Sequence, residues 1–343
     1  MKKSAVSTLG MLALLAASAH GAMAGDRDKG IRIFDTHAHL LGRDSDFISA
    51  AENALSAMAD LNIARTLVMP PPFTPNQRRL FRMEALRDAV AAAPDRLGFL
   101  GGGGSLNVMI QEAVRAGTTS VELKVRFRAR AQAIVDAGAF GFGEMTAEHV
   151  SRRRGHPYLT APPDHPLFLL LADIAAERRV PIDLHMEAVP RDMVRPDRLD
   201  EPNPATLKAN IAAFERLLSH NREARIIWAH AGWGNTGARL PNLMDRLLAA
   251  HPNLYMSLKI NRSSRGAVRP LDRDGRLRPD WRSLLESYGG RFMIGSDHKY
   301  RGHGRGRGRG EDTFRRLLSE LSENTARAVA WDNAIGLFGF RKK

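Results

Sequence analysis

Short apolar runs alternate with amphipathic stretches along this chain from residue 31 onward. The eight apolar runs lie at residues 31–36, 64–69, 97–101, 138–142, 180–184, 225–229, 254–258 and 291–295. Runs of this length with β-branched residues, as in Ile31-Arg32-Ile33, are typical of short strands. Between them, apolar residues recur at helical spacing in residues 49–61, 166–178 and 205–220. The alternation predicts an α/β fold, the (β/α)8 TIM barrel.

Two segments fit more than one structure. Residues 121–127 alternate like a strand, but Leu123, Phe127 and Ala131 also share one helical face, and we favour a helix. Residues 101–104 are four glycines that could cradle a phosphate, yet they lack the lysine and serine of a P-loop. There we expect a loop of close backbone approach at the barrel mouth.

The amino terminus has the features of a secretory signal peptide. A basic start is followed by a mostly small and apolar stretch from Ala5 to Ala17 and by the A-x-A pattern Ala22-Met23-Ala24. We expect residues 1–24 to be removed, which leaves a single barrel domain over residues 25–343 in the periplasm or outside the cell. The alternative is an uncleaved anchor helix. The stretch is shorter than the ~20 apolar residues that a span needs, so we expect no stable membrane anchor.

Charge and cysteine content narrow the classes of partner. The chain has a net charge of +14 and no cysteine, so metal ligands must be His, Asp or Glu. A basic chain suits nucleic acid or an anionic small molecule. The dense Arg/Gly run at residues 301–310 has no interleaved aromatic residue, which favours a solvated loop over an RNA-binding segment. We therefore expect a small-molecule substrate, possibly anionic, and no nucleic acid, while a homo-oligomer stays open.

Candidate metal ligands follow the apolar runs in order. His37 and His39 are two residues apart on a predicted strand, so their imidazoles point to the same face. The other candidates stand at or just past later strand ends, namely Glu144, His185, His230 and Asp297. Because a barrel builds its active site from the carboxyl ends of its strands, these side chains are expected to converge. Imidazole and carboxylate suit Zn²⁺, Mn²⁺ or Fe²⁺, and such an ion activates water at neutral pH.

The motifs resemble those of the amidohydrolase superfamily, in the amidohydrolase-related (amidohydrolase 2 type) branch that contains hydrolases and decarboxylases. The resemblance covers the whole mature chain. It rests on Asp35-Thr36-His37-Ala38-His39, Gly143-Glu144, His185, Ala229-His230-Ala231-Gly232, Gly295-Ser296-Asp297 and the ending 333–339.

The resemblance implies roles for these residues. It makes His37, His39, His185 and Asp297 ligands of a divalent metal, most simply zinc, with Asp297 also moving the proton. His230 then either contacts water and substrate or binds a second ion. Many relatives use a carboxylated lysine on the fourth strand, where this chain has Glu144. We favour one ion over two, with Glu144 as a ligand or next to one.

The expected function is that of an exported metal-dependent hydrolase that attacks an amide, lactone or ester carbonyl with activated water. Lys259 is a candidate for holding a substrate carboxylate or phosphate, and His298 for substrate binding or for orienting an imidazole. A metal-dependent decarboxylase on the same site is the first alternative, and a non-catalytic binding protein is the second.

Overall fold

The computed structural model describes residues 30–42, 46–72, 83–152, 156–260, 266–302 and 311–339. Contacts divide the chain into residues 1–31 and residues 32–343, and the helices and strands of the described residues lie in the second unit. The expected signal peptide at 1–24 and most of the Arg/Gly run fall outside the described residues. Among the helices of the described residues, none combines the length and the apolar character that crossing a bilayer requires.

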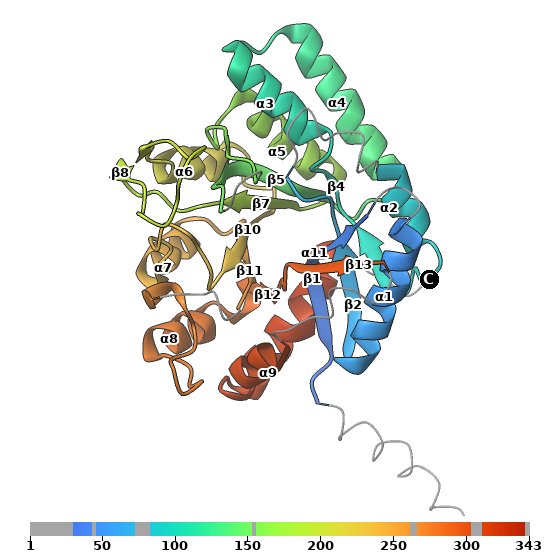
Figure 1. Ribbon diagram of the computed structural model, residues 1–343, viewed down its shortest axis with the longest axis vertical. Coiled ribbons are helices and arrows are strands. Elements are labelled where there is room, and N and C mark those ends of the chain that lie inside the picture. The colour runs from blue at the N-terminus through green and yellow to red at the C-terminus, as the bar shows by residue number, and fades with distance from the viewer. Residues whose placement is uncertain are drawn as a thin grey trace, which may run out of the picture. The chain divides into compact units, whose positions relative to one another are not determined.

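A curled, largely parallel sheet forms the centre of this unit (Figure 1). Its main strands are β1 (Ile33–Leu41), β2 (Ile63–Val68), β3 (Leu97–Phe99), β4 (Gly101–Gly102), β5 (Phe142–His149), β7 (Ile182–Met186), β10 (Ile226–Ala231), β11 (Leu254–Leu258) and β12 (Phe292–Ile294). They pair in the order β3-β2-β1-β12-β11-β10-β7-β5-β4. Two short strands pair at its border, β6 (Leu159–Thr160) with β5 and β13 (His298–Arg301) with β1, while β8 (Met193–Val194) and β9 (Thr206–Leu207) form a separate hairpin.

The two ends of this strand order are neighbours in the chain. Only Leu100 separates β3 from β4. The Leu100 amide donates to the Val68 carbonyl at 3.0 Å, and the Gly101 amide donates to the Gly141 carbonyl at 3.1 Å. The single extended segment 97–102 therefore bonds to β2 on one side and to the β5 segment on the other.

Helices cover the outside of the sheet, as Figure 1 shows. They are α1 (Asp46–Asp60), α2 (Met83–Val90), α3 (Leu106–Ala116), α4 (Val121–Asp136), α5 (Pro166–Arg178), α6 (Ile211–His220), α7 (Pro241–Ala250), α8 (Pro279–Ser287), α9 (Glu311–Ser319), α10 (Glu323–Arg327) and α11 (Asn333–Phe338), with short helical turns at Gly266–Val268, Gly289–Arg291 and Ala328–Asp332. The helix favoured over 121–127 is confirmed as the start of α4, where the Ser120 side chain accepts from the Leu123 amide at 3.2 Å. The helix expected over 166–178 is confirmed at both ends.

Three local predictions are wrong. The strand expected at 138–142 begins at Phe142 and continues to His149, because polar residues that suggest a loop are buried here. The helix expected from 205 begins at Ile211, because Thr206 and Leu207 pair as β9. The first two residues of the loop expected over 101–104 form the strand β4. The expected close approach is nevertheless present at Gly103, where a Cβ would lie 2.7 Å from the Pro70 carbonyl oxygen and 3.1 Å from that of Glu144.

The carboxy-terminal helix packs near the amino-terminal ends of the strands. One buried cluster joins Phe34 of β1 and Ile227 of β10, each the second residue of its strand, to Leu337 and Phe338 of α11. Arg225, just before β10, donates to the Leu337 carbonyl at 3.0 Å. This apolar end leaves the carboxyl ends of the strands free for polar chemistry.

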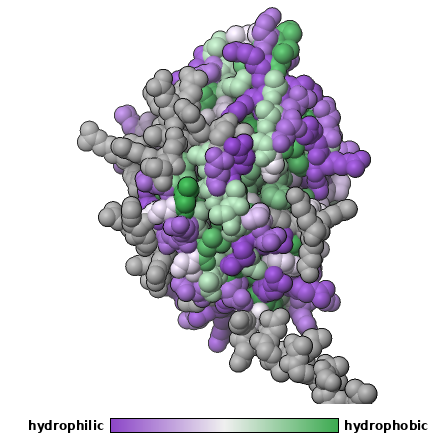
Figure 2. Space-filling model, turned by 90° about the vertical axis from the view of Figure 1, so that its right-hand side faces the viewer, coloured by the Kyte–Doolittle hydropathy of each residue, from purple (hydrophilic) through white to green (hydrophobic). Residues whose placement is uncertain are grey.

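On the face that Figure 2 presents, hydrophobic residues gather along the middle, with hydrophilic residues beside them. The large apolar side chains that the described residues expose are Ile48, Val121, Val125 and Val194. Exposed apolar residues in such small numbers are ordinary for a folded domain.

Candidate metal centre

The first strand, β1, carries two buried imidazoles. Their orientation is set by the partners of their Nδ1 atoms. His37 Nδ1 lies 3.1 Å from the Asp183 carboxylate on β7, and His39 Nδ1 donates to the Met69 carbonyl at 2.8 Å. Both rings are buried, and their planes are nearly perpendicular at a centroid distance of 5.1 Å. These bonds leave each Nε2 to face the centre of the site. A carboxylate or carbonyl behind the imidazole is the usual arrangement for a metal-binding histidine.

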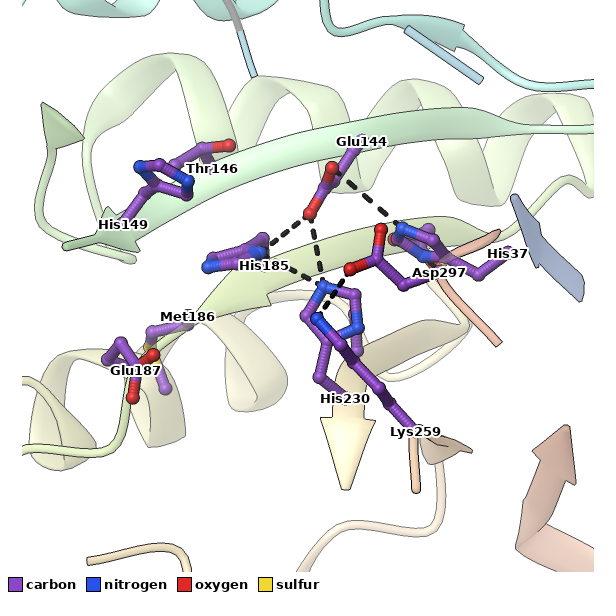
Figure 3. A network of polar contacts seen from close by, with 12 residues as sticks. His37, Glu144, Thr146, His149, His185, Met186, Glu187, His230, Lys259 and Asp297 are labelled. Carbon is purple, nitrogen blue, oxygen red and sulfur yellow. Dashed lines mark hydrogen bonds and ion pairs between the residues drawn. The ribbon is translucent and has the colours of Figure 1, made fainter. Parts of the chain in front are cut away.

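Glu144 on β5 lies at the middle of the cluster (Figure 3). Its Oε2 is 3.6 Å from His39 Nε2 and 3.8 Å from His37 Nε2. Its Oε1 is 2.6 Å from His185 Nδ1 and 3.2 Å from His230 Nε2. One carboxylate oxygen thus faces the pair from β1, and the other faces the pair from β7 and β10.

Asp297 closes the cluster after β12. Its Oδ1 is 2.9 Å from His39 Nε2, and its Oδ2 accepts a hydrogen bond from the Lys259 ammonium group. Asp297 and His230 both have left-handed backbones, with φ of 57° and 71°. Such conformations are costly for residues other than glycine, and they concentrate at functional sites. The preceding Gly295 is also required, because a Cβ there would lie 2.7 Å from Ser257 Cβ and 3.1 Å from His37 Cβ.

Burial and charge together set the protonation states. Burial raises the pKa of Glu144, but His185 and His230 outweigh it and hold that pKa well below its usual range. Burial likewise raises the pKa of Asp297, but Lys259 and Lys299 bring it well below normal. Burial lowers the pKa of His37, but the Asp183 carboxylate raises it, to about 9 overall. Burial and the Lys259 charge lower the pKa of His230. Glu144 and Asp297 are therefore ionised, as metal ligands must be.

The donor set fits a divalent metal. Two groups of ligand atoms lie within 4.8 Å of one another, one from His37, Glu144 and His230 and one from His37, His39 and Asp297. Among the described residues, the buried His37 Nε2 has no hydrogen-bond partner, although it lies 3.8 Å from Glu144 Oε2. An ion at this point would supply the missing partner.

A cavity of about 280 Å³ opens onto this centre. Six of the predicted site residues line it, namely His39, Glu144, His185, His230, Lys259 and Asp297. His37 lies behind them, fully buried. His298 is not among the lining residues, and its imidazole Nδ1 lies 3.2 Å from the Tyr300 hydroxyl. The residue that faces the cavity instead is its neighbour Lys299, on the other side of β13.

The structure adds functional residues that sequence reasoning missed. Asp183 could have been found, since it stands two residues before His185 and therefore on the same face of β7. His149 lines the cavity with its ring centroid 4.9 Å from that of His185, but its sequence surroundings carry no signal. The buried Arg239 donates to the carbonyls of Ala229 and Met186, which adjoin His230 and His185. Arg239 thus ties the two strands that carry these histidines.

Comparison with known proteins identifies a matching family and several similar structures. Residues 34–340 match the family model described as Amidohydrolase. The chain is similar to 2,6-dihydroxybenzoate decarboxylase from Rhizobium at 13% identity and a TM-score of 0.50, with 90% of this chain and 99% of that one covered. It is similar to a mutant organophosphorus hydrolase from Deinococcus radiodurans at 16% identity and a TM-score of 0.54, with 91% and 94% covered. A mutant PTE-like lactonase from the same organism gives 14% identity and a TM-score of 0.52, with 91% and 97% covered. No curated protein matches the chain.

Proposed function

This chain belongs to the amidohydrolase family, and we propose that it is a metal-dependent hydrolase of an amide, lactone or ester carbonyl. The observation that carries the proposal is the convergence of histidines and carboxylates from β1, β5, β7, β10 and the end of β12 around Glu144, at the base of an open cavity. Family and architecture alone do not distinguish among substrates, because this fold hosts many reactions.

The metal would be held by two donor sets that share Glu144. His37, His39 and Asp297 form one set, and His185 and His230 form the other on the opposite carboxylate oxygen. The sequence favours one ion, whereas this division of the donors would suit two. Zinc suits the ligands best, with manganese or iron as alternatives. When bound, such an ion lowers the pKa of a coordinated water toward ~7 and so supplies hydroxide.

The chain's own residues then handle the proton and the carbonyl. Asp297 is ionised and can accept a proton from the attacking water and pass it to the leaving group. The Lys259 ammonium group, in hydrogen-bond contact with Asp297 Oδ2, keeps that carboxylate oriented. His230 lines the cavity and can polarise the substrate carbonyl if it is not fully engaged as a ligand.

Two further features belong to the same proposal. We propose that the sheet closes into a (β/α)8 barrel, supported by the segment 97–102, which bonds to β2 and to the β5 segment at once. We also propose export to the periplasm or the exterior, on the basis of the leader-like residues 1–24. Amino-terminal sequencing of protein recovered from the periplasm or medium, with Gly25 first, tests the second point.

Metal analysis and a substrate screen test the function. Purified protein supplemented with Zn²⁺ or Mn²⁺ is assayed against lactones, N-acyl compounds, esters and aromatic carboxylates. Hydrolysis that is lost on chelation and in His37→Ala supports the proposal. Release of CO₂ from an aromatic carboxylate, with no hydrolysis, identifies a decarboxylase instead. A protein that contains no metal under these conditions contradicts both.

A further inference from the structure

The mouth of the cavity is lined by cations that form no ion pair with a carboxylate of the described residues. Arg152, Lys299 and Arg301 all line the cavity and are exposed. Within the described residues, no ion pair involves any of the three, whereas surface arginines elsewhere pair with acids, as Arg216 does with Asp164 at 2.6 Å. The acids that line the cavity are Glu144 and Asp297, and both already contact histidines. The entrance therefore has an excess of positive charge.

The register of β13 on β1 gives these cations an order from the metal centre outward. Lys299 pairs with His39, and Arg301 pairs with Leu41. Because alternate residues of a strand point the same way, both side chains project to one side. Two residues of strand correspond to about 7 Å, so Arg301 stands one step farther from the centre than Lys299.

Lys259, the cation that the sequence suggested for substrate binding, already contacts other side chains of the protein. Its ammonium group donates to Asp297 and lies 3.7 Å from the centre of the Trp233 ring. Arg152 lies over the same ring at 5.2 Å. The capacity to bind an anion therefore rests with the cations at the mouth rather than with Lys259.

Apolar side chains make up part of the cavity wall, beside the polar residues His149, His156 and Asn235. The apolar side chains are Leu41, Pro71, Pro72, Val150, Pro157 and Trp233. An apolar wall favours a hydrocarbon segment of the ligand, and convergent polar groups at its ends fix the orientation.

Resting on the proposed function, we infer that the substrate carries a carboxylate or phosphate at the end remote from the reacting carbonyl, joined to it by an apolar segment. Lys299 and Arg301 bind that anionic group, with Arg152 beside them. The metal centre holds the carbonyl, and the apolar side chains of the wall hold the segment between.

A matched pair of esters tests this inference by kinetics. Mono(4-nitrophenyl) glutarate carries the remote carboxylate, and its methyl ester removes that charge at nearly the same length. In Lys299→Gln/Arg301→Gln, kcat/KM for the anionic ester should fall about tenfold or more, since hydrogen bonds to charged groups contribute this much. The neutral ester should lose clearly less, because it has no group for Lys299 and Arg301 to bind and keeps only the effect of the Lys299 charge on Asp297. Equal losses for both esters overturn the inference.

A control variant separates local binding from net charge. Lys124→Gln/Arg126→Gln removes the same two charges from exposed positions on α4, away from the cavity. It should leave kcat/KM for both esters unchanged. A fall for the anionic ester equal to that of the Lys299/Arg301 variant overturns the inference, because the effect would then reflect long-range charge.

Binding without turnover keeps the test independent of the proposed reaction. Calorimetry measures the Kd of glutarate and of phenyl phosphate for metal-loaded and for chelator-treated protein. The Lys299/Arg301 variant should weaken binding about tenfold in both states. A loss confined to glutarate identifies a carboxylate, and a loss confined to phenyl phosphate identifies a phosphate. Unchanged affinity for both probes overturns the inference, whereas lost affinity without ester hydrolysis overturns only the proposed function.

Discussion

At the scale of single residues, the site depends on side chains that hold the ligands as much as on the ligands themselves. Asp183 is buried and contacts His37 Nδ1 at 3.1 Å. This contact directs His37 Nε2 toward Glu144, 3.8 Å away. Removing the Asp183 carboxylate leaves His37 in place but lets its ring rotate. Substitution of Asp183 should therefore cost less metal affinity than substitution of His37.

The first prediction compares these two positions. His37→Ala should abolish binding of the ion held by His37, His39 and Asp297, because it removes one of the three ligands of that donor set. Asp183→Asn should weaken the affinity for zinc by about 10–100-fold, the usual effect of removing the partner of a ligating histidine. Competition with a chromogenic chelator measures both. Wild-type affinity in His37→Ala would contradict the assignment of the centre, and wild-type affinity in Asp183→Asn would contradict the role of Asp183.

The second prediction concerns His230. Because its Nε2 lies on the Glu144 oxygen that faces His185, His230→Asn should lower the metal content from two ions to one per chain and abolish turnover. Elemental analysis and rate are measured on the same sample. Unchanged metal content with lost turnover would instead make His230 a residue that acts on the substrate at a one-ion site, and an unchanged rate would exclude both roles.

At the scale of elements, β5 shows where sequence patterns reach their limit. Hydropathy places a strand at 138–142, but the strand of the structure runs over Phe142–His149 and buries Glu144, Thr146 and Glu148. Polar residues enter a strand interior only where partners from other strands meet them, and those partners are far away in the sequence. The apolar strands β10 and β11 need no such partners, and the pattern predicts them within two residues.

The third prediction uses another buried group of β5. The Glu148 carboxylate accepts hydrogen bonds from Thr160 Oγ1 at 2.6 Å and from the Tyr158 hydroxyl at 3.0 Å. Burial, with the nearby Glu187 charge, raises the pKa of Glu148 from 4.5 to about 7. Between these two values the folded chain keeps a proton that the unfolded chain releases. The contribution of Glu148 to the free energy of unfolding therefore falls as the pH rises from 4.5 to about 7.

Glu148→Gln should remove this contribution. The difference in Tm between pH 5 and pH 7.5 should be smaller in the variant than in the wild type, as measured by differential scanning calorimetry in one buffer series. Glu122→Gln, at an exposed position on α4, is the control and should keep the wild-type difference. The same pH dependence in Glu148→Gln and in the wild type would contradict the prediction.

At the scale of the whole molecule, the alternation of apolar runs and amphipathic stretches was sufficient to predict a parallel sheet with helices outside it. It also located the carboxyl-end residues that meet at Glu144, because strand ends of one sheet share an edge. It did not reveal the cations at the mouth. Lys299 and Arg301 belong to β13, which pairs with β1 across nearly the whole chain, and short-range periodicity carries no information about such pairing.

The fourth prediction is made at this scale. Zinc should raise Tm with increasing concentration, because an ion that binds only the folded chain stabilises it by mass action, by about 2.7 kcal/mol at 100 times its Kd. Chelation should return Tm to the metal-free value. Differential scanning fluorimetry across a zinc series tests this, with His37→Ala as the control whose Tm should rise less. A wild-type Tm that is independent of zinc would contradict it.

The distribution of the ligands along the chain has a consequence for biosynthesis. His37 is among the first residues of the domain to leave the ribosome, and Asp297 is among the last. Half of the centre, His37 and His39 with Glu144, exists long before the partner that completes it. A nascent chain that ends before Asp297 therefore lacks the complete set of ligands. The ion that Asp297 would bind can be captured only once β12 has been made and lies beside β1.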